Sequence, residues 1–272
     1  MEPHPVDVPG GLPLRPIDRV EWHSYASRSS FPQKYYPEEL LTPSRRRSPP
    51  EKISHRGAHQ TLPENSIPAF LRAIELGADA IELDVHATSD GVVMVHHDPV
   101  VNAQGEARTR IADLSAGDLG RFPLAHGVEI PTLQAVLDAV GDQARIYVEI
   151  KTADIEPLVV RCIRESGASC AVHAFDHRFV KTVKRIFPAI RTGVLEVARH
   201  VDPVASLLAA GAQDLWQEVS FIDEELVVRA HSVNARVIAW TADDPDQWKT
   251  LNELGVDGIC TDRIAELATW SL

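Results

Sequence analysis

From residue 51 onward, apolar and polar positions follow a rhythm that predicts strands alternating with helices. Strand-like apolar runs occur at KISHRGA (52–58), AIELDVHA (80–87), ARIYVEIK (144–151), SCAVHAF (169–175), RTGVLEV (191–197), DLWQEVSF (214–221), ARVIAWTA (235–242) and DGICTD (257–262). Helix-like stretches lie between most of them, at IPAFLRAIELG (67–77), TLQAVLDAVG (132–141), EPLVVRCIRESG (156–167), HRFVKTVKRIF (177–187), PVASLLAAG (203–211), EELVVRAHSVN (224–234) and DQWKTLNELG (246–255). Helices that start after Asp or Pro, several of which stop at Gly, support these boundaries. Eight such units predict an α/β protein, a closed (β/α)₈ TIM barrel rather than an open doubly wound sheet.

One further apolar run interrupts the rhythm. GVVMVHHD (91–98) follows the second strand directly across a Ser-Asp-Gly turn, which predicts a β-hairpin and hence a short insertion after that strand. A glycine-rich dinucleotide fingerprint and a phosphate-loop motif are both missing from the sequence, which argues against a Rossmann fold.

Residues 1–50 differ from the rest of the chain. They are rich in Pro, Arg and Ser, as in TPSRRRSPP (42–50), and show no sustained period. They also carry aromatic rings that solvated linkers seldom have, at Trp22, Tyr25, Phe31, Tyr35 and Tyr36. We therefore expect an irregular N-terminal arm (1–50) that packs on the barrel or a partner, where it could clasp a homodimer, followed by a barrel domain (51–272).

Net charge, cysteine content and apolar runs limit the binding partners and the cellular location that we expect. The net charge of −12 leaves no broad basic surface, so a nucleic-acid partner is not expected. The three cysteines form no CxxC pair, which is typical of a reducing compartment. No run approaches the roughly 20 apolar residues of a spanning helix, and the N-terminus lacks a signal-like apolar core, so we expect a cytoplasmic protein without membrane insertion.

Charged side chains gather at the predicted carboxyl ends of the strands, where the active site of a TIM barrel lies. Glu82 and Asp84 are two residues apart, as are Glu149 and Lys151, so each pair shares the face that points into the barrel. Three carboxylates at one rim would repel each other unless a cation joined them, and oxygen ligands suit Ca²⁺ or Mg²⁺. The alternative for Glu82 and Asp84 is an ion-pair network with Arg56 and Lys151.

Two histidines, His55 and His97, flank the same predicted cluster. Histidine can act as acid or base near neutral pH. Phosphodiester cleavage needs one group to activate the nucleophile, another to protonate the leaving alkoxide, and positive charge on the phosphoryl oxygens. The two histidines can supply the base and the acid, and Arg56, Lys151 or a bound cation can supply the positive charge.

The stretch HRGAHQTLPENSIPAFLRAIELGADAIELDVHATSDGVVMVHHDP (55–99) resembles the opening motif of the glycerophosphodiester phosphodiesterase family. Further likeness follows at IPTLQAVL (130–137), VEIK (148–151), AFD (174–176), AWTADD (239–244) and GVDGICTDR (255–263), so that the resemblance spans about 53–265. Two departures leave the substrate open: the segment after HDP lacks the LDRTTNG-like stretch common in the family, and the insertion between His97 and Ile130 is short.

The resemblance implies a role for each matching residue. By this resemblance, the acid/base pair is His55 and His97, and the metal ligands are Glu82, Asp84 and Glu149. The groups that contact phosphate are Arg56 and Lys151. Trp240 lines the pocket or, alternatively, belongs to the core. Among the neighbours, Glu64 supports the site or the first helix, His86 is a candidate pocket residue, and His59 and His96 are bystanders.

The expected function is metal-dependent hydrolysis of a small glycerophosphodiester, such as glycerophosphocholine, to glycerol 3-phosphate and an alcohol. Two alternatives remain open at this point. A lysophospholipase D-like enzyme would need an apolar entrance to the site. A catalytically silent barrel that binds phosphate esters would have no need for a costly carboxylate cluster.

Overall fold

The computed structural model describes residues 48–102 and 108–270 of the 272-residue chain. The predicted arm therefore lies outside the described residues, apart from its last three, and so do all five of its aromatic rings. The barrel domain begins with its first strand at Glu51.

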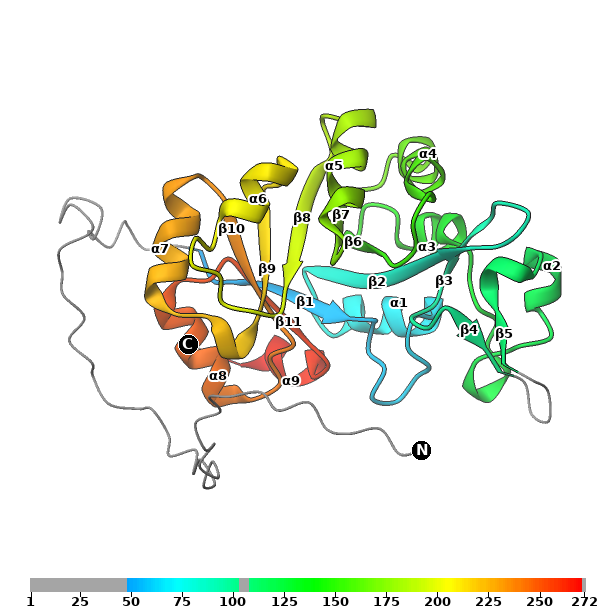
Figure 1. Cartoon of the computed structure of the whole chain (residues 1–272). Coiled ribbons are helices and arrows are strands. Elements are labelled where there is room, and N and C mark those ends of the chain that lie inside the picture. Colours follow the sequence, from blue (N-terminus) through cyan, green and yellow to red (C-terminus); the bar gives the residue numbers. More distant parts are fainter. Residues whose placement is uncertain (1–47, 103–107, 271–272) are drawn as a thin grey trace, which may run out of the picture. The chain divides into compact units, whose positions relative to one another are not determined.

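Eight parallel strands form a closed ring (Figure 1), which confirms the predicted TIM barrel. The ring closes because the first strand pairs with both the last and the second, with Ser54 opposite Thr261 and His55 opposite Glu82. The ring strands are β1 (Glu51–His55), β2 (Ala80–Ala87), β6 (Arg145–Ile150), β7 (Cys170–Ala174), β8 (Arg191–Glu196), β9 (Asp214–Glu218), β10 (Arg236–Trp240) and β11 (Gly258–Thr261).

Helices alternate with these strands on the outside of the ring (Figure 1). They are α1 (Ile67–Glu75), α3 (Leu133–Val140), α4 (Glu156–Ser166), α5 (His177–Ile186), α6 (Ala205–Ala210), α7 (Glu224–Ser232), α8 (Pro245–Leu254) and α9 (Ile264–Thr269). Seven match the predicted helices, and α9 follows the last strand. Several begin at a side-chain cap, as Ser66 and Asp223 show. Within 48–102 and 108–270, no helix is both long and apolar enough to cross a membrane.

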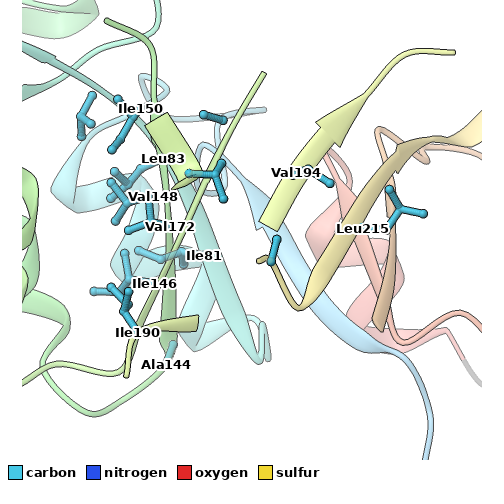
Figure 2. Close-up of a cluster of buried hydrophobic side chains, with 14 of the residues drawn as sticks. Ile81, Leu83, Ala144, Ile146, Val148, Ile150, Val172, Ile190, Val194 and Leu215 are labelled. Carbon is cyan, nitrogen blue, oxygen red and sulfur yellow. The ribbon is translucent and has the colours of Figure 1, made fainter. Parts of the chain in front are cut away.

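The larger core lies between the ring and the helices. Outward-facing side chains of β2 and β6, including Ile81, Leu83, Ile146 and Val148, are fully buried in this layer (Figure 2). Strands covered on both faces read as continuous apolar runs, which is why the sequence showed them clearly.

A second, smaller core fills the inside of the ring. Trp216 is its largest member, and its indole stacks on the imidazole of His173 with ring centroids 4.3 Å apart. The indole fits because the facing residue on β8 is Gly193: a Cβ added there would lie 2.8 Å from Trp216 Cδ1. The inside of the barrel is thus filled by packed side chains, as is usual for a barrel of eight strands.

An ionic network closes the opposite end of the barrel, where the strands begin. The Tyr147 hydroxyl donates to Glu51 Oε2 at 2.7 Å and accepts from Arg236 Nη1 at 3.0 Å. Arg191 forms an ion pair with buried Asp214 at 2.7 Å. These contacts link β1, β6, β8, β9 and β10, and they stabilise the barrel far from its mouth.

The predicted hairpin is present. Strand β3 (Val93–Val95) runs antiparallel to β2, with Val85 opposite Val95. The rest of the insertion contains β4 (Val100–Val101), β5 (Thr109–Arg110), α2 (Ala116–Leu119) and the 3₁₀ turns η2 (Ile111–Asp113) and η3 (Ala125–Gly127), and a third such turn, η4 (Val219–Phe221), follows β9. Met94, Ile111, Leu119 and Phe122 belong to a small core of the insertion's own.

We predict that Gly193→Ala lowers the free energy of unfolding by about 1–3 kcal/mol, because the added methyl group must displace the Trp216 ring. Denaturant unfolding followed by tryptophan fluorescence measures this. Gly117→Ala is the matched control, since a Cβ there meets only Ser115 Oγ at 3.8 Å. Equal stability of the two variants would contradict the packing role of Gly193.

Candidate active site

The turn after β1 brings the first two predicted residues to the mouth. Arg56 has φ 54° and Gly57 φ 83°, so the chain reverses immediately after His55. Glycine is required at the second position, because a Cβ on Gly57 would lie 2.8 Å from Ala69 Cβ of α1. The reversal lets the Arg56 amide donate to the Glu82 carbonyl oxygen at 3.0 Å. Glu64 lies beside the guanidinium, with both carboxylate oxygens 3.3 Å from Arg56 Nη1.

Asp84 is fully buried and is surrounded by positive charge. Its carboxylate lies 3.1 Å from Arg56 Nε and 3.3 Å from Lys151 Nζ, and it accepts a hydrogen bond from Asn65 Nδ2 at 2.9 Å. Burial alone would raise the pKa of Asp84, but Lys151, Arg56 and the Asn65 hydrogen bond outweigh it and lower the pKa to about 2. Asp84 therefore takes part in the ion-pair network with Arg56 and Lys151 that the sequence also allowed.

The pKa values of Glu82 and Glu149 are shifted in the opposite direction to that of Asp84. Burial and the nearby charge of Asp84 raise the pKa of each to about 7. Glu149 lies 2.9 Å from Lys151 Nζ, so this ammonium bridges Asp84 and Glu149. Glu82 Oε1 is buried without a hydrogen-bond partner among the described residues. The ion-pair network thus leaves part of the negative charge at this mouth unbalanced.

Within residues 48–102 and 108–270, two groups of side chains have the geometry of a cation site. In the first, Glu82, Glu149 and His173 each offer one ligand atom, all within 4.8 Å of one another. Burial lowers the pKa of His173 to about 4, so its imidazole is neutral and able to ligate. The second group, His55, His59 and Asp262, is already joined by hydrogen bonds. Carboxylate donors with an unpartnered buried oxygen fit a divalent cation, and the first group supplies them.

His55 is held by a carboxylate. Its Nδ1 lies 2.6 Å from Asp262 Oδ1, while its Nε2 lies 3.9 Å from Glu82. Burial opposes protonation of His55, but the Asp262 hydrogen bond and the charge of Glu82 outweigh it and raise the pKa. Asp262 is itself fixed, because its amide donates to Asp243 Oδ1 at 2.8 Å. Nδ1 is thereby occupied, and Nε2 is the nitrogen that faces the carboxylate cluster.

His97 lies at the end of the hairpin and is more loosely held. Its Nδ1 is 2.8 Å from Asp98 Oδ1, and its carbonyl oxygen accepts a hydrogen bond from His86 Nε2 at 3.0 Å. The hairpin is tied to the strand of Asp84, because the amide of His96 donates a hydrogen bond to the Asp84 carbonyl oxygen at 3.0 Å. The buried side chain of His86 thus holds the backbone of His97 by a hydrogen bond.

Trp240 lies at the end of β10, half-buried, where it borders the mouth and also packs on the inner core. Its ring meets Phe175 edge-on at a centroid distance of 5.4 Å, and Lys151 Nζ lies 5.9 Å from the Phe175 centroid.

Direct contacts therefore join His55, Arg56, Glu82, Asp84, Glu149 and Lys151, whereas His97 and Trp240 reach this cluster through neighbours. Sequence reasoning missed the roles of Asp262, Asn65 and His173, and took His59 for a bystander although its Nε2 lies 3.0 Å from Asp262 Oδ1. Asp262 directly follows a strand and His173 interrupts an apolar one, so the rule that found Glu82 could have found both.

The sequence profile of the glycerophosphoryl diester phosphodiesterase family matches residues 55–266. The chain belongs to this family. It is accordingly a phosphoric diester hydrolase, and the resemblance seen in the sequence is confirmed. Among its relatives, a glycerophosphodiester phosphodiesterase of Caldanaerobacter subterraneus is 32% identical over 77% of this chain and 93% of its own length. A probable glycerophosphodiester phosphodiesterase 2 of Mycobacterium tuberculosis is 33% identical over 78% of this chain and 86% of its own length.

Solved structures agree on the fold. A glycerophosphodiester phosphodiesterase from Parabacteroides distasonis superposes with a TM-score of 0.72 at 26% identity, over 81% of this chain and 95% of its own. A phosphodiesterase from Oleispira antarctica, solved with the product sn-glycerol-3-phosphate, gives a TM-score of 0.74 at 20% identity, over 80% of this chain and 95% of its own.

We predict that the metal-free protein loses stability as the pH rises. The pKa values of Glu82 and Glu149, about 7, exceed the unfolded value, so the folded state binds extra protons. That stability is fully present below about pH 4.5 and is lost as the pH passes through about 7. Denaturant unfolding in chelator at pH 5 and pH 8 measures this loss in the free energy of unfolding. Glu149→Gln should make the difference between the two pH values smaller by about 1–3 kcal/mol, because an amide does not titrate.

The matched control for this variant is Glu253→Gln, an exposed position on α8. It should keep the pH dependence of the wild type. If Glu149→Gln kept it as well, the raised pKa of Glu149 would be refuted.

Proposed function

We propose that this enzyme hydrolyses a small glycerophosphodiester, such as glycerophosphocholine, to glycerol 3-phosphate and an alcohol with the help of a divalent cation. The observation that carries the proposal is the convergence of three buried carboxylates with Arg56 and Lys151 beside a histidine held by Asp262. Family membership and the 32% identical relative support the substrate class. An inert binding barrel is disfavoured, because it would bear the cost of this cluster without using it.

Glu82, Asp84 and Glu149 are the proposed ligands, and Ca²⁺ or Mg²⁺ the proposed ion, since both prefer carboxylate oxygen. His173 is an additional candidate ligand, because it shares a site with Glu82 and Glu149. When bound, the cation supplies positive charge that offsets charge on the phosphoryl oxygens.

Arg56 and Lys151 are the proposed phosphate-binding residues. Both are cationic and only partly exposed, with side-chain exposures of 19% and 17%, so water screens them weakly. Burial opposes their charge, but the surrounding carboxylates outweigh it and raise the pKa of each, so both stay protonated. Trp240 is the proposed apolar wall beside them.

His55 and His97 are the proposed acid and base. One takes a proton from the attacking hydroxyl, which is either water or the 2-hydroxyl of the glycerol unit, as its oxygen bonds to phosphorus. The ester bond from phosphorus to the leaving oxygen breaks, and the other histidine protonates that oxygen. With the glycerol hydroxyl as nucleophile, a cyclic phosphate forms first and water then opens it. Overall, one water is consumed per alcohol released. Asp262 keeps the Nδ1 proton of His55 in place, so His55 acts through Nε2.

Removal of the cation should abolish turnover. Release of glycerol 3-phosphate from glycerophosphocholine is measured after exhaustive EDTA treatment and again after addition of Ca²⁺ or Mg²⁺. We expect a loss of at least about 100-fold, restored by one of the two ions. Glu82→Gln should prevent the restoration, whereas Glu253→Gln on the surface should not. Full activity in EDTA would show that the cation assignment is wrong.

Loss of either histidine should lower kcat by about 10²–10⁴-fold in His55→Ala and His97→Ala. The variant that lacks the general acid should recover on a p-nitrophenyl diester, whose leaving group needs no proton, and this assigns the two roles. His96→Ala is the matched control, because His96 Nδ1 is turned to the carbonyl oxygen of Asp98. Near-normal turnover of glycerophosphocholine by His97→Ala would remove His97 from the mechanism.

A further inference from the structure

A second group of possible metal ligands lies beside the carboxylate cluster, where the ends of β1 and β11 meet. It consists of His55, His59 and Asp262, and we call it the His–Asp group. One ligand atom from each side chain lies within 4.8 Å of the other two. The three side chains are 19%, 22% and 35% exposed, so an ion can reach them from solvent.

The fold brings these side chains together from two elements. Pairing of β1 with β11 places Asp262 beside His55. The turn at Arg56 and Gly57 then returns the chain, and the His59 amide donates to the carbonyl oxygen of Gly57 at 2.8 Å. The rings of His55 and His59 consequently lie edge to face, with centroids 6.4 Å apart. His55 Nδ1 and His59 Nε2 converge on the same oxygen, Asp262 Oδ1, at 2.6 Å and 3.0 Å.

The carboxylate at the centre of this group is fixed from behind. The Asp262 amide donates to Asp243 Oδ1 at 2.8 Å, and the Thr261 hydroxyl donates to the same oxygen at 2.8 Å. Outer partners of this kind hold a metal ligand in position, and their loss typically costs about 10–100-fold in metal affinity. The His–Asp group therefore has both the ligand atoms and the support that a metal site requires.

The chemistry of the group suits zinc. Zinc binds imidazole nitrogen and carboxylate oxygen at about 2.0–2.2 Å in tetrahedral geometry, which sets neighbouring ligand atoms about 3.3 Å apart. The two separations at Asp262 Oδ1 differ from this value by less than about 1 Å, so small shifts make room for the ion. Two imidazoles and one carboxylate, with water in the fourth position, form a recurrent zinc set. Ca²⁺ and Mg²⁺ prefer the oxygen ligands of the carboxylate cluster instead.

We propose that the His–Asp group binds Zn²⁺ and that the bound zinc inhibits the enzyme. His55 turns Nδ1 to Asp262 and Nε2 to Glu82, 3.9 Å away. Zinc on Nδ1 confines the imidazole proton to Nε2, so His55 cannot accept a proton there. Zinc also takes the carboxylate that supports the protonated ring, so His55 is impaired as an acid as well. The inhibition rests on the proposed function, whereas the binding of zinc does not.

Calorimetric titration of the full chain with ZnCl₂ tests the binding, in a non-chelating buffer with excess Mg²⁺ and Ca²⁺ to occupy the carboxylate cluster. His59→Gln keeps an N–H group for Asp262 but replaces the imidazole with a poor zinc ligand, so we expect at least about tenfold weaker binding. His96→Gln, at another histidine of the mouth, is the matched control and should bind zinc as the wild type does. Glu149→Gln, which alters the carboxylate cluster, should also leave this binding unchanged.

Nuclear magnetic resonance of ¹⁵N-histidine-labelled protein identifies the ligand atoms. Zinc should shift the signals of His55 Nδ1 and His59 Nε2, the two nitrogens that face Asp262. Shifts confined to other histidine nitrogens would rule out the His–Asp group as the site.

Turnover of glycerophosphocholine in the same buffer tests the inhibition, with each variant compared with its own rate without zinc. Saturating zinc should lower the rate of the wild type and of His96→Gln by at least about 100-fold, the usual contribution of acid/base catalysis. His59→Gln should need at least about tenfold more zinc for the same loss.

Three further results would overturn the inference. Zinc binding that is as tight in His59→Gln as in the wild type, or that is lost only in Glu149→Gln, places the ion elsewhere. Zinc that fills the His–Asp group of an active wild type without lowering its turnover refutes the inhibition. A wild type that never cleaves glycerophosphocholine removes the proposed function and the inhibition with it, while the calorimetry and the nitrogen shifts still decide the zinc site.

Discussion

The mouth of this barrel depends on one electrostatic constraint, the burial of Glu82, Asp84 and Glu149 within a few ångströms of one another. Carboxylates in such surroundings cannot all stay ionised without compensation. Arg56, Lys151 and Asn65 provide part of it, and each of them is itself held by the carboxylates. The left-handed turn at Arg56 and Gly57 is part of this arrangement, because it places the Arg56 guanidinium beside Asp84. The compensation is stronger for Asp84, whose pKa is lowered, than for Glu82, whose pKa is raised.

An apolar layer separates this mouth from the ionic network at the opposite end. Trp216, stacked on His173, fills the ring between them. Packed side chains therefore separate the two polar networks along the barrel. The one around Glu51, Tyr147 and Arg236 is internally paired and can stabilise the ring independently of what happens at the mouth. The paired ionic network and the proposed active site thus lie at opposite ends of the same strands.

Local pattern predicted most of the fold and part of the site. The eight strands could be read because each is apolar on both faces, and Glu82, Asp84, Glu149 and Lys151 stood out as charges within such runs. Asp262 could not be paired with His55 in this way, because they are 207 residues apart and meet only when β11 closes on β1.

The insertion that carries His97 is a small module mounted on the barrel. Its core of Met94, Ile111, Leu119 and Phe122 packs apart from the two barrel cores, while strand β3 ties the insertion to β2 and an isolated bridge pairs Met94 with Thr132 at the start of α3. Substitutions within this small core are therefore expected to shift the segment that carries His97 more than they shift the carboxylates of β2 and β6. A relative with a different core in this insertion would then present the proposed histidine at another position above the same carboxylates.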